Sequence, residues 1–287
     1  MIEAYALVVV FTLQILAFSV LHPTLLIRYT RMKAAEYPPE RFPQLYTGVF
    51  RSTERFVSIY RALNTVVSVV GVVLLAWLFV YMQRPDWKWP TVFICTVGYF
   101  IFQFLPLAVL VVVGIRQITA FRNLPKEPTR KAVLERRGLF DFVSPVVVLL
   151  AALVGVSFFA FMIHAIHFRA PAFEASTGYF ILGVVTLSYV FSGIWMYKTL
   201  YGRKLNPFES HSDRMHTIGL GVRGTFYTGI AADVYLPILF TLDMAGFETW
   251  MPVAQSAFFA VFASLLCVPL VGLLRKPEQH TVSEVTP

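Results

Sequence analysis

Charged residues are scarce in this sequence. Asp, Glu, Lys and Arg together make up 14% of the 287 residues, whereas a soluble domain carries about 25%. No polar stretch is long enough to form a large soluble enzyme domain, and hydrophobic residues reach 57%. This hydrophobicity also excludes an intrinsically disordered chain. The sequence therefore predicts a polytopic membrane protein.

Cysteine and the common catalytic motifs are scarce or missing as well. The two cysteines, Cys95 and Cys267, both fall in apolar stretches at different predicted depths, so we expect reduced thiols and no disulfide scaffold. The sequence has no Walker loop, no Gly-x-Ser-x-Gly and no His-Glu-x-x-His. The last apolar stretch, Met251–Leu274, lacks the lysine that a retinal protein needs. We expect no cofactor and no metal site.

What the sequence does contain is seven long apolar runs. A helix of about 20 apolar residues spans a bilayer, and lipid offers the backbone no hydrogen bonds, so each run is predicted to be a transmembrane helix. The predicted fold is an all-α integral membrane protein with a single domain over residues 1–274 and a tail over 275–287. The predicted spans are residues 5–27, 57–82, 91–115, 139–163, 178–197, 225–243 and 251–274.

Lys and Arg are distributed unevenly among the loops. Of the 24 cations, 20 lie in the tail and in the loops after the first, third and fifth spans, and only Arg84, Lys88 and Arg169 lie in the other loops. The positive-inside rule then places the N-terminus outside and the C-terminus in the cytoplasm, in the plasma (inner) membrane. The net charge of +8 indicates contact with anionic lipids on the cytoplasmic side. No loop is long enough for a nucleic-acid-binding module, so we expect no nucleic acid partner.

Short motifs recur every 86 residues. Arg51, Arg137 and Arg223 have this spacing and each precedes an apolar run. Phe56-Val57-Ser58 recurs as Phe142-Val143-Ser144, and Arg137-Gly138-x-Phe140 recurs as Arg223-Gly224-x-Phe226. We interpret this as three parallel copies of helix, basic loop and helix, a type of repeat known in transporters. The copies cover about residues 5–82, 91–163 and 178–243, and the helix at 251–274 is extra.

Ionisable side chains inside predicted spans are the first candidates for a functional site, because they are costly there. Asp233 lies midway along the sixth span, Arg61 about one turn into the second, and Asp141 near the start of the fourth. Asn64 shares the helix face of Arg61. When the copies are aligned at this 86-residue spacing, Arg61 corresponds to Asp233 two copies later, and Arg55 corresponds to Asp141 one copy later.

Three interpretations of Asp233 and Arg61 stay open. In the first, they form a structural ion pair. In the second, Asp233 relays protons or ions. In the third, Arg61 extends to the membrane surface, or Asp233 lines a groove accessible to lipid. Two further polar residues in spans, Gln14 and Gln103, are expected to join helices by hydrogen bonds.

Another cluster of polar residues lies in the third basic loop. Glu209, His211, Asp213 and His216 are candidates for a site at the cytoplasmic face, although the polar capped start of a short interfacial helix is the better interpretation of this cluster. The residues Glu54-Arg55 and Arg61-Ala62-x-Asn64 are similar to a motif of the MAPEG glutathione-handling membrane enzymes. The spacing differs and under a tenth of the chain is covered, so the resemblance implies no activity.

The leading functional hypothesis is a non-enzymatic transporter-like or channel-like protein, or a subunit of a membrane complex, alone or as a homo-oligomer. The alternative is a membrane-embedded enzyme or lipid-handling protein with its site at the cytoplasmic face. The sequence identifies no substrate for either.

Topology gives the first testable prediction. Single cysteines placed in residues 84–90 or 166–177 should react with an impermeant thiol reagent added outside, whereas cysteines in 117–136 should react only after permeabilisation. The reason is the uneven distribution of cations across the membrane. Outside labelling of 117–136 in sealed cells would contradict the seven-span orientation.

Overall fold

The computed structural model describes residues 2–36, 40, 53–112, 138–168, 175–202 and 211–274, and these residues form helices and turns without a strand. The elements are α1 (Ile2–Ile15), the π-helix η1 (Leu16–Leu21), α2 (His22–Glu36), α3 (Thr53–Tyr81), α4 (Trp89–Gln103), the 3-10 turn η4 (Leu139–Asp141), α6 (Pro145–Phe168), α7 (Ala175–Tyr201), α8 (His211–Met244), the 3-10 turn η5 (Glu248–Trp250) and α9 (Met251–Leu274).

Within these described residues, seven helical segments are long and apolar enough to cross a membrane, and each overlaps one of the seven predicted runs. The helical fold class is therefore confirmed. The segments are Ile2–Met32, Glu54–Tyr81, Trp89–Val112, Pro145–His167, Gly178–Tyr201, Arg214–Met244 and Glu248–Gly272.

Two predicted boundaries are wrong. The short separate helix expected around Asp213–His216 is the first part of α8, which runs unbroken from His211. Helix elongation is cooperative, and no proline intervenes before Pro237 to stop it. The fourth span begins at Pro145 and not at residue 139, because proline is favoured in the first turn of a helix. The helix-forming run 130–137 in the second basic loop also predicts a short interfacial helix, and this run lies outside the described residues.

The helices divide into two compact units. Unit 1 comprises Met1–Gln117 and Pro252–Pro287, so it contains α1 to α4 and α9, whereas unit 2 comprises Ile118–Met251 and contains α6 to α8. The boundary falls inside the second predicted copy, since α4 and α6 lie in different units. The repeat and the single domain both stay predictions.

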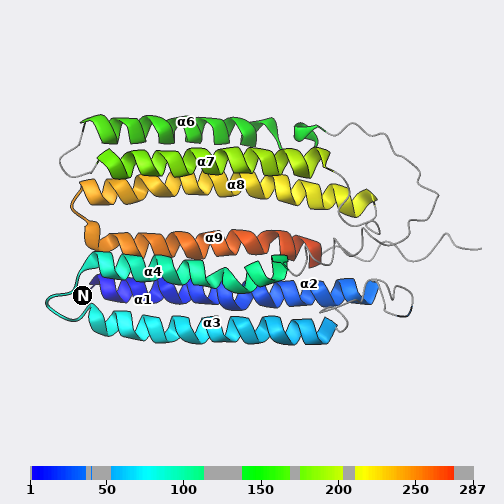
Figure 1. Ribbon diagram of the computed structural model, residues 1–287, viewed down its shortest axis with the longest axis horizontal. Coiled ribbons are helices and arrows are strands. Elements are labelled where there is room, and N and C mark those ends of the chain that lie inside the picture. The colour runs from blue at the N-terminus through cyan, green and yellow to red at the C-terminus, as the bar shows by residue number, and fades with distance from the viewer. Residues whose placement is uncertain are drawn as a thin grey trace, which may run out of the picture. The chain divides into compact units, whose positions relative to one another are not determined.

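In unit 1, the continuous helical segment α1–η1–α2 lies beside α3, and α4 and α9 complete the bundle (Figure 1). Phe56 and Val57 at the start of α3 pack with Ile27 of α2. Farther along the bundle, Phe18 packs with Ala263 of α9. These apolar contacts hold the four spans together.

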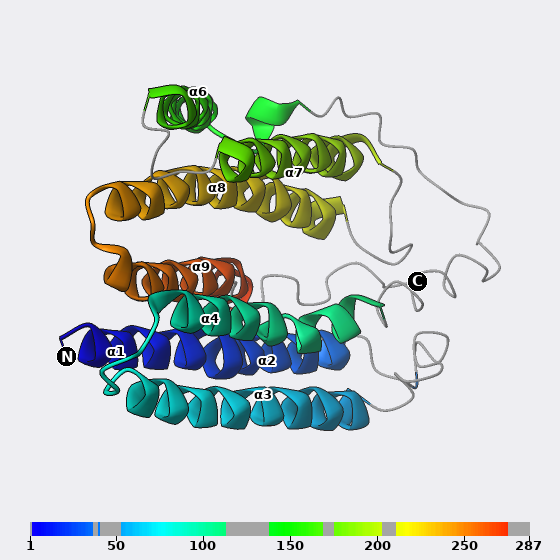
Figure 2. The same ribbon diagram turned by 60° about the vertical axis from the view of Figure 1, so that its left-hand side comes forward.

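In unit 2, α6, α7 and α8 all contact one another (Figure 2). Phe158 and Met162 of α6 pack with Phe240 of α8. The second Phe-Val pair, Phe142-Val143, is buried like Phe56-Val57, here against Leu200, Ile218 and Val222. Both Phe-Val pairs therefore lie in apolar clusters, one in the first turn of α3 and the other just before the start of α6.

Unit 1 provides a prediction about a close approach between helices. A Cβ at Gly71 of α3 would overlap the Tyr99 hydroxyl of α4, which donates a hydrogen bond to the Val67 carbonyl at 3.1 Å. Gly71→Ala should lower the free energy of unfolding by about 1–3 kcal/mol, as overpacked cores do, measured by denaturant titration in detergent micelles.

Gly98→Ala is the matched control, because a Cβ at Gly98 in α4 meets nothing within 4 Å. It should leave stability unchanged or raise it slightly, since alanine favours helix. Equal losses in the two variants would contradict this account of Gly71.

Candidate functional site

Asp233 forms the centre of the candidate site. It lies in the C-terminal half of α8 and is 5% exposed. The Tyr189 hydroxyl of α7 donates a hydrogen bond to Asp233 Oδ2. A buried carboxylate needs such a partner, because its desolvation is otherwise uncompensated, and hydrogen bonds to ionised groups are stronger than neutral ones.

The third helix of unit 2 contributes a glycine to the site. A Cβ at Gly155 of α6 would lie 3.0 Å from the Tyr189 hydroxyl oxygen and 3.7 Å from Asp233 Oδ2. Gly155 therefore leaves room for the Tyr189–Asp233 pair between α6, α7 and α8. The Tyr189 ring also contacts Phe159 on the next turn of α6, with centroids 6.1 Å apart.

Exposure differs sharply across this pair. Tyr189 is 39% exposed, whereas Asp233 is almost fully buried. The phenol thus connects an inaccessible carboxyl group with the surface of unit 2. A hydroxyl group can both donate and accept a proton, so this arrangement suits stepwise proton movement to and from Asp233.

The other predicted intramembrane candidates are found elsewhere. Arg61 is exposed on α3, and Asn64 is buried one turn later, where its Nδ2 donates to the Tyr60 carbonyl at 2.8 Å. Asp141 is exposed in η4, and its Oδ2 accepts the Gly138 amide at 2.7 Å. Asn64 and Asp141 thus have local structural roles, and the ion pair between Arg61 of unit 1 and Asp233 of unit 2 stays a prediction.

The cytoplasmic-face cluster is only partly described. Glu209 lies outside the described residues, and for His211 and Asp213 the structure describes only the backbone, in the first turn of α8. His216, one turn later, is half-buried. The nearby Arg214 Nη2 donates to the Gly202 carbonyl at 2.7 Å, which attaches the start of α8 to the end of α7.

Sequence reasoning missed Tyr189 and Gly155. Unit 2 has many aromatic side chains on apolar helices, so nothing in its sequence distinguishes Tyr189 from its neighbours Tyr179 and Tyr197. Reasoning from sequence did identify Gln14 and Gln103, and Gln14 Nε2 donates to Gln103 Oε1 at 2.8 Å. The expectation that these residues join two helices is confirmed.

Metal ligands do not cluster in the described part of the chain: it contains no group of three His, Cys, Asp or Glu residues placed to hold an ion. Cys95 and Cys267 are free thiols. The carboxylate of Asp233 with one phenol offers too few oxygen atoms for a cation such as Ca²⁺, which takes six to eight.

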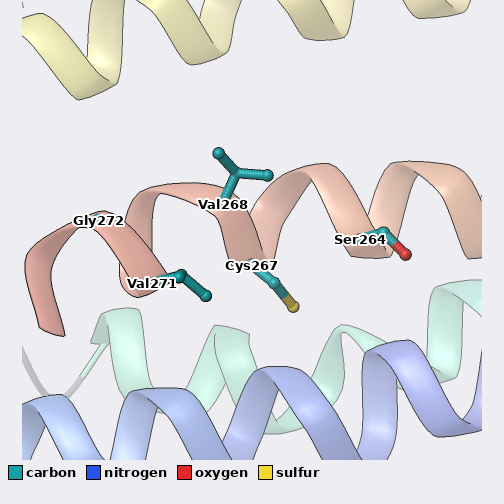
Figure 3. A pocket seen from close by; sticks show the side chains of 5 residues that line it. All are labelled: Ser264, Cys267, Val268, Val271 and Gly272. Carbon is teal, nitrogen blue, oxygen red and sulfur yellow. The ribbon is translucent and has the colours of Figure 1, made fainter. Parts of the chain in front are cut away.

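A shallow pocket lies along the C-terminal half of α9. Its lining is Ser264, Cys267, Val268, Val271 and Gly272 (Figure 3). The two polar groups are already used within the helix: the Ser264 hydroxyl donates to the Ala260 carbonyl at 2.8 Å, and the Cys267 thiol to the Ala263 carbonyl at 3.3 Å. The remaining lining is apolar, so this pocket offers no group for polar recognition or chemistry.

Comparisons with known proteins give no match to a family model, a curated protein or a solved structure.

Double-mutant cycles on thermal stability should identify the partner of Asp233. With Tyr189 as partner, Asp233→Asn and Tyr189→Phe should show a coupling of about 0.5–3 kcal/mol, as expected for residues in one hydrogen bond. A second cycle with Arg61→Asn tests the predicted ion pair, in which the double variant should recover much of the loss caused by each single change.

Tyr197→Phe on the same helix is the control, because this tyrosine is 66% exposed. Its cycle with Asp233→Asn should be additive. Additive effects of Tyr189→Phe and Asp233→Asn would show that the hydrogen bond between the two side chains contributes nothing to stability.

Proposed function

We propose that the protein is a multi-pass plasma-membrane protein of transport type, in which the Tyr189–Asp233 pair of unit 2 takes up and releases protons. The observation that carries the proposal is the buried carboxyl group of Asp233, held by a tyrosine that is itself partly exposed. Ionisable groups at membrane depth commonly mark ion pathways and proton relays.

The choice of a proton follows from the composition of the site. A proton needs one acceptor and a chain of groups that can donate and accept, which Asp233 and Tyr189 provide. A metal cation needs several oxygen, nitrogen or sulfur ligands, and no such group of ionisable ligands exists among the described residues.

The helices and the distribution of cations are consistent with this setting. Seven described helices are long and apolar enough to cross a membrane, and the excess of Lys and Arg in alternate loops supports an orientation with the N-terminus outside. The three parallel copies and contact with anionic lipids belong to the same proposal. The enzymatic or lipid-handling alternative depends on Glu209, His211 and Asp213, and it stays a prediction.

Proton flux into proteoliposomes tests the proposal directly. An internal pH-sensitive dye should report proton entry driven by a potassium diffusion potential in vesicles with the wild-type protein. Asp233→Asn should reduce the flux to that of protein-free vesicles, because the amide cannot exchange the proton. Tyr189→Phe should slow the flux, because the carboxyl group loses its connection to the surface.

The control is Glu248→Gln, which alters an exposed acid in η5 and should leave the flux unchanged. Wild-type flux no greater than that of protein-free vesicles, or full flux in a folded Asp233→Asn variant, would overturn the proposal.

A further inference from the structure

Unit 1 contains a second buried polar cluster, which the proposed function does not use. Gln14 of α1 donates to Gln103 of α4, and Gln103 Nε2 in turn donates to the Ser19 hydroxyl of η1 at 3.1 Å. All three side chains are buried. One turn before Gln103, the Tyr99 hydroxyl reaches the Val67 carbonyl of α3. Gln14, Ser19, Gln103 and Tyr99 thus form a layer of uncharged polar side chains, which joins three spans of unit 1.

Both helices that supply the layer are interrupted at this level. The first span changes from α-helix to π-helix over Leu16–Leu21, which includes Ser19. The third span leaves the α-helix after Gln103, where the Phe104 amide turns back to the Ile101 carbonyl at 3.0 Å. Pro23 and Pro106 follow closely and lack an amide hydrogen. Paired interruptions of this kind commonly surround binding sites in transporters.

Four buried polar atoms of unit 1 have no hydrogen-bond partner among the described residues. They are Gln14 Oε1, both amide atoms of Gln255 and the Ser256 hydroxyl. Gln255 and Ser256 are fully buried near the start of α9. Buried polar groups of native proteins are nearly always hydrogen-bonded, to protein or to water. We therefore expect these four atoms to hydrogen-bond to a bound molecule.

The orientation of α9 places Gln255 on the inner side of unit 1. Gln255, Phe259 and Ala263 are spaced by four residues and so share one helix face. Phe259 stacks on Phe100 of α4 with centroids 3.6 Å apart, and Ala263 packs with Phe18 of α1–η1. One turn before Phe100, Thr96 of α4 is fully buried. Gln255 and Thr96 thus lie at about the same level, one turn before the stacked phenylalanines.

We propose that Gln14, Gln255 and Ser256 form a water-binding site that α9 closes against α1 and α4. The buried polar side chains on the described helices of unit 1 are amides and hydroxyls, including the phenols of Tyr60 and Tyr99, together with the imidazole of His22 and the thiol of Cys267. No carboxylate is buried among these described side chains. An ion would find no counter-charge there, whereas water donates and accepts hydrogen bonds and matches both kinds of unpaired atom.

Entry of water requires a small displacement of α9. The four atoms are enclosed in this structure, and α9 approaches the backbones of α1 and α4 less closely than α3 approaches α1. The unpaired atoms make the closed arrangement costly, which favours opening. Water then binds between the buried faces of α1, α4 and α9, where it hydrogen-bonds to the four unpaired polar atoms of Gln14, Gln255 and Ser256.

X-ray radiolytic footprinting of the purified full-length protein tests the site, because bound water yields hydroxyl radicals that oxidise adjacent side chains. Tyr99 and Phe259, although buried, should be oxidised severalfold faster than Phe158, which is also buried, in the apolar cluster of unit 2. Oxidation of Tyr99 and Phe259 no faster than that of Phe158 would overturn the proposal.

A second variant distinguishes a hydrated amide from a dry one. Gln255→Leu removes both polar atoms and introduces no sulfur that would itself consume hydroxyl radicals, so it should slow Phe259 oxidation severalfold. Gln83→Leu, at an exposed turn residue, is the control and should change nothing. Unchanged Phe259 oxidation in a folded Gln255→Leu variant would identify an amide that is merely unsatisfied, and would also overturn the proposal.

Discussion

Hydrogen bonding inside apolar helices is the constraint on which the rest of this structure depends, because apolar surroundings supply no partners for polar groups. Short side chains meet it within their own helix: the hydroxyls of Thr12, Thr65 and Thr186 each donate to a carbonyl four residues earlier. Longer polar side chains reach across to another helix, as Gln14 and Tyr189 do. The hydrogen bonds between helices therefore define two polar centres, one around Gln14 and Gln103 in unit 1 and one around Tyr189 and Asp233 in unit 2.

The two centres use similar geometry for different chemistry. In each unit, a tyrosine hydroxyl of one helix enters the space left by a glycine of the preceding helix: Tyr99 at Gly71 in unit 1 and Tyr189 at Gly155 in unit 2. Gln103, the central amide of unit 1, precedes Tyr189 by 86 residues, which is the spacing of the predicted repeat. The unit 1 centre is neutral, whereas that of unit 2 contains a carboxyl group. This difference separates the proposed water site from the proposed proton site.

Polar groups and helix breaks coincide in unit 1 for a physical reason. A proline removes a backbone donor, and π-helical segments frequently occur at functional sites. The irregular turns of η1 and of α4 present Ser19 and Gln103 toward each other. In unit 2, α8 contains Pro237 one turn after Asp233, yet the helix continues to Met244. The site in unit 2 is therefore formed by side chains without an interruption of α8.

Hydropathy by itself determined the helical class and the number of spans, because a continuous apolar run of membrane length admits few other structures. It also identified Asp233, Gln14 and Gln103, since polar residues are conspicuous in apolar runs. Only the tertiary structure decided their partners: Tyr189 and Gly155 resemble many other residues of their helices until packing brings them beside Asp233. The same holds for the start of α8 at His211 and for α9, which joins unit 1 although it follows unit 2 in the chain. Side-chain packing between helices distant in sequence sets these features, and a local pattern of hydropathy carries no information about it.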